Sequence, residues 1–330
     1  MISIKRQELF AALNLCKARV LSKNMPLFVG WALTNRCNYT CKYCARWNTP
    51  SEELTTQEIL YVIGELAEMG AYRINFTGGE PLMRQDLGSI VRTAKTKGIR
   101  VDISTNGSLV PQMMDIIKGI DCLRVSYDGP QEIHDRQRIE GGHSDAVEAI
   151  ISAKQNNLSV SLHTVLTNIN LDYAPHILEF AKGVSVLVHF AVIGSINYIS
   201  ESDVQKLLPD VNKYKTTLEF LIKEKKNGNK NIGNSLDGLK YLYEWPNYKD
   251  ITCCAGKIYC RIEPNGDVYP CGGVVAGGSS INCKYKGFRS AFKKLKLVGC
   301  KACWCDTRIE MSKIYTFNLK VVRDLIGYII

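Results

Sequence analysis

Hydrophobic and polar residues alternate with two different periods along residues 27–195. Short apolar runs of strand length are separated by segments in which apolar residues recur every three or four positions, the spacing of amphipathic helices. Alternation of six strands with helices predicts an α/β fold with a parallel sheet and right-handed crossovers, either open or closed into a barrel. The expected strands are LFVGWAL (27–33), YRINFT (72–77), RVDIST (100–105), CLRVSY (122–127), SVSLHTVL (159–166) and SVLVHFAVI (185–193).

The helix expected after the first strand carries clear signals at both ends. Thr55 followed by Glu58 has the pattern of a capping box, and Gly70 is a typical helix stop. Residues 86–98 repeat this design and also end on a glycine. The apolar positions that place residues 55–70 on a helix are Ile59, Val62, Ile63, Leu66 and Met69.

The pattern changes after residue 200. A charged stretch is followed by a cysteine-rich tail in which Asn265-Gly266, between strand-like runs, indicates a hairpin. We therefore expect an N-terminal helix in 1–26, an α/β unit in 27–200, a helical linker in 201–250 and a small α+β extension in 251–330.

Composition is ordinary for a soluble globular protein, with 45% hydrophobic and 22% charged residues. No apolar run approaches the ~18 residues of a membrane span. The N-terminal segment has charges among its apolar positions, unlike a signal peptide, so we expect a cytoplasmic protein. The net charge of +10 is concentrated partly in 283–301 and is interpreted as a solvated helix face. Without an aromatic-interleaved basic stripe or a nucleic-acid module, no nucleic-acid partner is expected.

Both chain ends are amphipathic or strongly apolar. The C-terminal segment 317–330 is apolar between its few charges. We favour packing of both ends against the α/β unit, and the alternative is peripheral contact with an anionic membrane. On an N-terminal helix one face would carry Ile2, Leu9, Ala12, Leu13, Cys16 and Val20, flanked by Arg6, Lys17 and Arg19.

Thirteen cysteines, an odd and clustered set, need an explanation. In a reducing compartment such clusters indicate metal binding or catalysis rather than disulfides. Cys16, Cys122 and Cys283 stand apart and are expected to be ordinary thiols. The clusters are 37/41/44, 253/254/260/271 and 300/303/305.

The first cluster contains three cysteines, Cys37, Cys41 and Cys44, spaced C-x3-C-x2-C. A structural zinc site or an electron-carrying iron–sulfur cluster uses four ligands, whereas three thiolates leave one iron of a [4Fe–4S] cluster open. The alternative is a zinc site that takes a distant fourth ligand. With the aromatic Tyr43 before the last cysteine, the motif resembles the signature of the radical S-adenosylmethionine (SAM) superfamily.

This resemblance implies a partial (β/α)6 TIM-type barrel and a specific chemistry. In the family, SAM chelates the open iron through its amino and carboxylate groups. An electron from the cluster, delivered by a flavodoxin- or ferredoxin-type donor, cleaves SAM to methionine and a 5′-deoxyadenosyl radical. The radical then takes a hydrogen atom from a substrate, which here is unidentified.

Three further segments support the resemblance, and each follows an expected strand, the end at which such barrels build their sites. FTGGEPL contains Gly78, Gly79, Glu80 and Pro81; in the family this loop meets the SAM amino group through its backbone, which glycine allows.

The other two segments supply polar and charged groups. Ser104 and Asn106 in ISTNG match positions that contact the SAM ribose and carboxylate. Arg138 in EIHDRQR matches a position that pairs with the carboxylate, although an isolated arginine is often only a surface residue.

The tail segment 253–271 resembles the start of a SPASM or Twitch extension, which binds auxiliary [4Fe–4S] clusters. The resemblance implies one auxiliary cluster, because the cysteines that would complete a second are absent. Structural zinc is the alternative. The implied ligands are Cys253, Cys271, Cys300 and Cys303, with Cys254, Cys260 and Cys305 as competing candidates.

Two classes of function remain. The leading one is a radical SAM enzyme, and the rival is a non-catalytic iron–sulfur or zinc protein, which has no use for the GGEP loop or an open iron. Substrates of relatives with such tails include ribosomal peptides, sugars or aminocyclitols, and lipids. About 26 residues precede the first strand, too few for a fused peptide-recognition domain.

Overall fold

A curved, nine-stranded sheet forms the centre of the computed structural model, which describes residues 6–193, 201–247, 250–275, 278–296, 299–300 and 302–318. The strand order in these residues is β6-β5-β4-β3-β2-β1-β7-β8-β9, so the sheet stays open. The six expected strands pair in parallel with their sequence neighbours, which confirms the partial-barrel prediction. They are β1 (Phe28–Thr34), β2 (Arg73–Gly78), β3 (Arg100–Thr105), β4 (Cys122–Ser126), β5 (Val160–Leu166) and β6 (Leu187–Val192).

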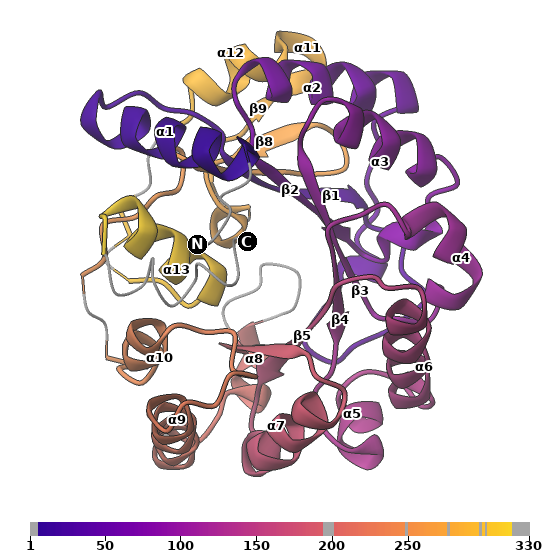
Figure 1. Cartoon of the computed structure of the whole chain (residues 1–330), viewed down its shortest axis with the longest axis vertical. Coiled ribbons are helices and arrows are strands. Elements are labelled where there is room, and N and C mark those ends of the chain that lie inside the picture. The colour runs from indigo at the N-terminus through magenta and orange to yellow at the C-terminus, as the bar shows by residue number, and fades with distance from the viewer. Residues whose placement is uncertain are drawn as a thin grey trace.

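Helices cover the outer face of the sheet (Figure 1). The predicted capping box is present, because the Thr55 side chain accepts from the Glu58 N–H while the Glu58 carboxylate accepts from the Thr55 N–H. Gly70 adopts a left-handed φ of 82° and ends that helix. The helices here are α2 (Thr56–Glu68), α3 (Leu87–Thr96), α4 (Val110–Ile117), α5 (Gln131–Gln137), α6 (Gly142–Gln155) and α7 (Ala174–Gly183).

The two faces of the sheet differ in polarity, as the two-residue period of a strand requires. Apolar side chains such as Phe76 and Ile103 are fully buried in the main core. The inner face carries charged and amide side chains instead. There Asp102 pairs with Arg73 at 3.3 Å and with Arg124 at 2.7 Å.

The tail continues the same sheet. β7 (Tyr259–Ile262) pairs in parallel with the free edge of β1, and β8 (Asp267–Tyr269) and β9 (Ile281–Asn282) follow antiparallel. The β7–β8 turn lies at the expected Asn265-Gly266. The remaining elements are α8 (Glu201–Leu207), α9 (Val211–Lys226), α10 (Leu236–Leu242), α11 (Cys283–Lys286), α12 (Phe288–Lys293), α13 (Asp306–Tyr315) and the short 3-10 helices η1 (Arg46–Asn48), η2 (Pro81–Met83), η3 (Leu171–Tyr173) and η4 (Gly272–Val274).

The N-terminal helix α1 (Arg6–Val20) packs through a face other than the apolar one expected. Its buried Ala18 contacts the cluster that contains Leu27 and Ile258. Leu9 and Val20, on the expected face, are 54% and 73% exposed. Because Ala18 is small, the helix lies close to the cluster of Leu27 and Ile258. The larger side chains of Leu9 and Val20 point outward. Ile2 and residues 319–330 lie outside the described residues. None of the described helices is long and apolar enough to cross a membrane.

Candidate active site

The predicted site segments meet at one edge of the sheet. The cysteine loop (residues 35–53) follows β1, the glycine motif ends β2, Asn106 follows β3 and Asp128 follows β4. Because parallel strands point the same way, their carboxyl ends lie at the same edge. The sheet therefore brings together side chains that are up to about ninety residues apart in the sequence.

The two glycines of the β2 motif lie directly against the backbone of the cysteine loop. Gly79 N–H donates to the Thr34 carbonyl at 2.8 Å, and Glu80 N–H donates to the Arg36 carbonyl at 2.8 Å. A Cβ on Gly78 would lie 2.2 Å from the Thr34 oxygen, and one on Gly79 would lie 2.2 Å from the Arg36 oxygen. The glycines were expected for approach to a ligand, and the structure adds a second reason, which is contact with the loop itself.

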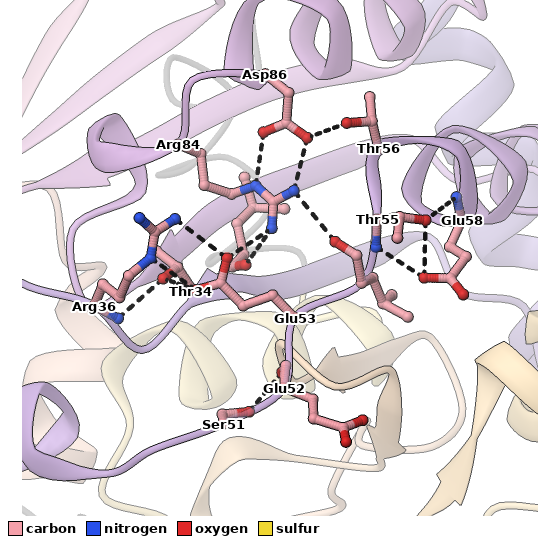
Figure 2. A network of polar contacts seen from close by, with 12 residues as sticks. Thr34, Arg36, Ser51, Glu52, Glu53, Thr55, Thr56, Glu58, Arg84 and Asp86 are labelled. Atoms are coloured by element: carbon pink, nitrogen blue, oxygen red, sulfur yellow. Dashed lines mark hydrogen bonds and ion pairs between the residues drawn. The ribbon is translucent and has the colours of Figure 1, made fainter.

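Arg84, just after the motif, holds both ends of the cysteine loop (Figure 2). Its guanidinium donates to the Leu33 carbonyl at 3.1 Å and to the Leu54 carbonyl at 3.2 Å. The same group pairs with Glu53 at 3.2 Å and with Asp86 at 2.7 Å. The base of the loop is therefore closed by one buried cation with two carboxylate partners.

A second buried arginine joins the cysteine loop to β7. Arg46, two residues after Cys44, makes a bidentate pair with Glu263 at 2.9 and 3.2 Å. Arg261 donates to the same carboxylate at 2.8 Å. Burial alone would raise the pKa of Glu263, but Arg261 and Arg46 outweigh it and lower that pKa to about 2. The carboxylate is thus ionised and connects the loop to the tail.

Glu80 links the glycine motif to the end of β3. Its buried carboxylate accepts from Leu82 N–H at 3.0 Å, from Thr105 Oγ1 at 3.0 Å and from Asn106 N–H at 2.9 Å. Burial raises the pKa of Glu80 to about 7, even though these three donors oppose the shift. The side chain predicted to bind cofactor therefore acts here as a connector between two motifs.

The three thiols of the loop are half-buried; Cys37 and Cys41 have polar neighbours, and Cys41 and Cys44 also pack against an apolar cluster. Cys37 Sγ accepts from Tyr39 N–H at 3.4 Å and lies 4.0 Å from Asn106 Nδ2. Burial raises the pKa of Cys37 to about 12, and it also raises that of Cys41. Thiolates at such positions need a compensating cation, which bound iron would supply.

The chemistry of this donor set fits a [4Fe–4S] cluster with one open iron. Among the described residues, no three potential ligands are gathered as a metal-binding group. The loop offers three thiols within eight residues.

Arg138, Tyr43 and Cys41 come together around a residue that the sequence analysis did not assign. Arg138 Nε pairs with Asp128 at 2.6 Å, and its Nη1 lies 3.9 Å from Cys41 Sγ. The Tyr43 hydroxyl lies 3.4 Å from the same Asp128 carboxylate. Asp128 belongs to the VSYDGP segment at the end of β4. Its position after a strand is the sequence feature from which a role in the site could have been predicted.

Three predicted cofactor-binding residues remain to be placed, namely Ser104, Pro81 and Asn106. Ser104 Oγ donates to Asn75 Oδ1 at 3.1 Å on the inner face of the sheet. Pro81 is the first residue of η2. Asn106 Nδ2 also donates to Asn38 Oδ1 at 2.9 Å, so it contacts the cysteine loop twice.

The tail thiols fall into two groups. Cys253 Sγ and Cys271 Sγ each accept from a backbone N–H two residues further on, at 3.5 and 3.4 Å. Cys254 and Cys260 are fully buried in apolar clusters. Electrostatic interactions connect Cys271 with Cys300, Cys303 and Cys305. Among the described residues of the tail, no three thiols are gathered as a metal-binding group.

The fold and the motif positions define an open α/β barrel with a cysteine loop after its first strand. A profile described as the Radical SAM superfamily matches residues 31–181. Residues 31–181 of the chain thus carry a Radical SAM domain, and the chain is similar to enzymes of this superfamily.

Individual relatives cover most of the chain. It is 26% identical to the AdoMet-dependent heme synthase of Methanosarcina barkeri over 83% of this chain and 84% of that protein. It is 28% identical to the PqqA peptide cyclase of Granulibacter bethesdensis over 72% of this chain and 66% of the cyclase. The crystal structure of Streptococcus suis SuiB bound to S-adenosylmethionine superposes with a TM-score of 0.67 at 14% identity, covering 87% of this chain and 71% of SuiB, which shows a shared fold.

The glycine contact leads to a matched pair of substitutions. In Gly79→Ala the new methyl group meets the Arg36 and Asn35 carbonyls, so the cysteine loop must shift. We expect iron in the loop to fall and SAM cleavage to drop about 10- to 100-fold. Gly64→Ala in α2 meets nothing within 4 Å, and we expect it to stabilise the fold by about 0.5–1 kcal/mol without changing cleavage. Equal cleavage by the two variants would contradict the proposed contact.

Glu80 leads to a pH-dependent prediction. Its folded-state pKa is raised, so between its ordinary value and about 7 the folded chain holds a proton that the unfolded chain lacks. The stability of the wild type relative to Glu80→Gln should therefore decrease as pH rises through about 7. The amide cannot accept all three hydrogen bonds, which should cost about 1–3 kcal/mol at low pH. Urea unfolding of the two proteins at several pH values measures this, and a constant difference would be the contrary result.

Proposed function

We propose that this protein cleaves SAM reductively at a [4Fe–4S] cluster held by Cys37, Cys41 and Cys44, and that the 5′-deoxyadenosyl radical takes a hydrogen atom from a substrate. The observation that carries the proposal is the set of three thiols on one loop, against which the glycine motif, Asn106 and Arg138 are packed. A scaffold protein that needed only a four-thiolate site would have no use for these neighbours.

The chain's own residues have distinct roles in this proposal. The Gly78-Gly79 backbone and Pro81, held by Glu80, would face the amino group of SAM at the loop. Ser104 and Asn106 offer hydroxyl and amide groups to its ribose and carboxylate. Tyr43 would support this cofactor site from the protein side.

Arg138 would meet the SAM carboxylate from beside Cys41. Its Nε is engaged with Asp128, and among the described residues its Nη2 has no hydrogen-bond partner. A guanidinium held on one edge by a carboxylate can still offer its other edge to a second one. Asp128 would then orient Arg138 and also fix the position of Tyr43.

We further propose that the tail, residues 251–330, binds one auxiliary [4Fe–4S] cluster. Cys253 and Cys271 are supported as ligands by the N–H groups directed at their sulfurs. The 300–305 segment would supply the other thiolates. Cys254 and Cys260 are embedded in apolar side chains and are better explained as core residues. The auxiliary cluster would bind substrate or accept the electron released when a product radical is oxidised.

The partners are proposed from the chemistry and from relatives. An external one-electron donor of flavodoxin or ferredoxin type would reduce the first cluster. The names of the relatives indicate two substrate classes, because one is a heme synthase and another is a peptide cyclase. The polar inner face of the sheet, with Ser104, Asn75 and His163, would contact the substrate.

The first test removes the three loop thiols. Replacing Cys37, Cys41 and Cys44 by Ala should abolish the formation of 5′-deoxyadenosine from SAM under dithionite, because no site for the first cluster remains. The fold should survive, since the thiols lie on a loop outside the main apolar core, and Cys41 and Cys44 pack only against a small cluster around Tyr43. Chromatographic detection of 5′-deoxyadenosine measures the effect, with circular dichroism as the folding control. Cleavage at the wild-type rate by the folded variant would reject the assignment.

The second test uses the same triple variant to examine the tail. After anaerobic reconstitution it should keep about four irons per chain and a [4Fe–4S] absorption spectrum, because the tail offers four thiolates. Iron and zinc are determined by elemental analysis. Zinc in place of iron, or no metal at all, would exclude an auxiliary redox cluster.

A further inference from the structure

Arg308 is a buried cation with no carboxylate partner among the described residues. Its guanidinium lies 3.3 Å from the centroid of the Tyr259 ring. Its Nη2 donates to Cys305 Sγ at 3.6 Å and its Nη1 to Met311 Sδ at 3.8 Å, while Nε has no partner. A charge buried among neutral groups is costly unless an anion balances it.

The groups around Arg308 limit what that anion is. Its electrostatic neighbours are the Tyr259 hydroxyl and the thiols of Cys305, Cys271 and Cys254. The nearby Asp306 makes no ion pair with Arg308 among the described residues; its Oδ1 lies 3.7 Å from His163 Nε2 and accepts from Cys305 Sγ at 3.9 Å. The thiols of Cys305, Cys271 and Cys254 are therefore the groups near the guanidinium that would become negative as thiolate ligands. An iron–sulfur cluster with thiolate ligands carries net negative charge and accepts hydrogen bonds at its sulfurs.

We propose that Cys305 is a ligand of the auxiliary cluster and that Arg308 donates a hydrogen bond to its sulfur and balances the charge of the cluster. This inference rests on the proposed auxiliary cluster and revises the ligand set that the family resemblance implies. Cys300 is exposed, and its electrostatic neighbours are Cys253 and Cys271, whereas Arg308 is not among them. Cys305 Sγ accepts from Arg308 Nη2 and interacts electrostatically with Cys271 and Cys303. The assigned set becomes Cys253, Cys271, Cys303 and Cys305.

The assignment gives Arg308 a measurable effect on the cluster. A guanidinium keeps its positive charge at all accessible pH values. A fixed positive charge beside a cluster stabilises the reduced form, which holds one more electron, and so raises the reduction potential. Arg308 is thus a positioning and charge-balancing residue, and it is not itself a ligand.

The ligand set is tested in the variant that lacks Cys37, Cys41 and Cys44, so that only tail iron is counted. Cys300→Ser and Cys305→Ser are added separately, and iron is measured after anaerobic reconstitution. We expect Cys300→Ser to keep about four irons and Cys305→Ser to lose at least one of them. Full iron in Cys305→Ser, or loss only in Cys300→Ser, would overturn the assignment.

The charge effect is tested with Arg308→Gln and Arg308→Lys in the same background. We expect Arg308→Gln to keep its iron but to show a more negative reduction potential in a spectroscopic redox titration. Arg308→Lys should remain nearer the parent value because it retains the charge. Arg289→Gln, on α12 and paired with Glu68, is the matched control and should leave the potential unchanged. An unchanged potential in Arg308→Gln would overturn the role of Arg308.

The outcomes separate this inference from the function on which it rests. If the background variant binds no iron, the auxiliary cluster itself is wrong and the inference falls with it. If that variant holds four irons while Cys305→Ser and Arg308→Gln match it, only the Cys305–Arg308 assignment fails. Should Arg308→Gln not fold, the iron contents of Cys305→Ser and Cys300→Ser still decide the assignment of Cys305.

Discussion

The close approach of the Gly78-Gly79 backbone to residues 34–36 is the contact on which the site depends. Two short hydrogen bonds cross this junction, and the space available there excludes any side chain. The contact fixes the start of the cysteine loop, and Arg84 binds the carbonyl groups at both ends of that loop. Glu80 then joins the glycine motif to Asn106 through a hydrogen bond. Three thiols on a flexible loop would bind iron in many geometries. Here the loop is held by the ends of three neighbouring strands, and in the proposed cluster one open iron would face a ligand bound at the same edge.

The second constraint is the continuity of the sheet. β7 pairs with β1, and the buried Arg46–Glu263 pair joins the cysteine loop to the end of β7. β8 runs antiparallel to β7, so Cys271 lies toward the end of the sheet at which β1 and β7 begin. Cys271 is thus separated from the cysteine loop by roughly the length of β1, which is about 20 Å for seven residues. At that distance a tail cluster would not ligate the same SAM molecule, and a role toward substrate or electrons suits it better.

The sequence alone predicted much of the fold and the residue types of the site. The six strands were recognisable because each is a short run rich in apolar residues between helix-patterned segments, and the capping box at Thr55 because its pattern is local. β7 has only four residues, and it pairs with β1, some 230 positions earlier. This pairing could not be predicted, because no local sequence pattern shows which distant strand a short strand joins. Asp128 and Arg308 were not assigned, because a single charged residue acquires its meaning only from the groups that the fold places around it. The outward face of α1 likewise depends on which side chain fits against Leu27.

The central claim is that the cluster on the cysteine loop leaves one iron for SAM. Electron–nuclear double resonance of the reduced protein with SAM labelled by 15N in the amino group and 17O in the carboxylate tests it directly. The account predicts hyperfine couplings from both nuclei to the cluster, which are lost when Cys37, Cys41 and Cys44 are replaced. If SAM binds, as shown by equilibrium dialysis, but neither nucleus couples to the reduced cluster, the claim of an open iron that chelates SAM is wrong.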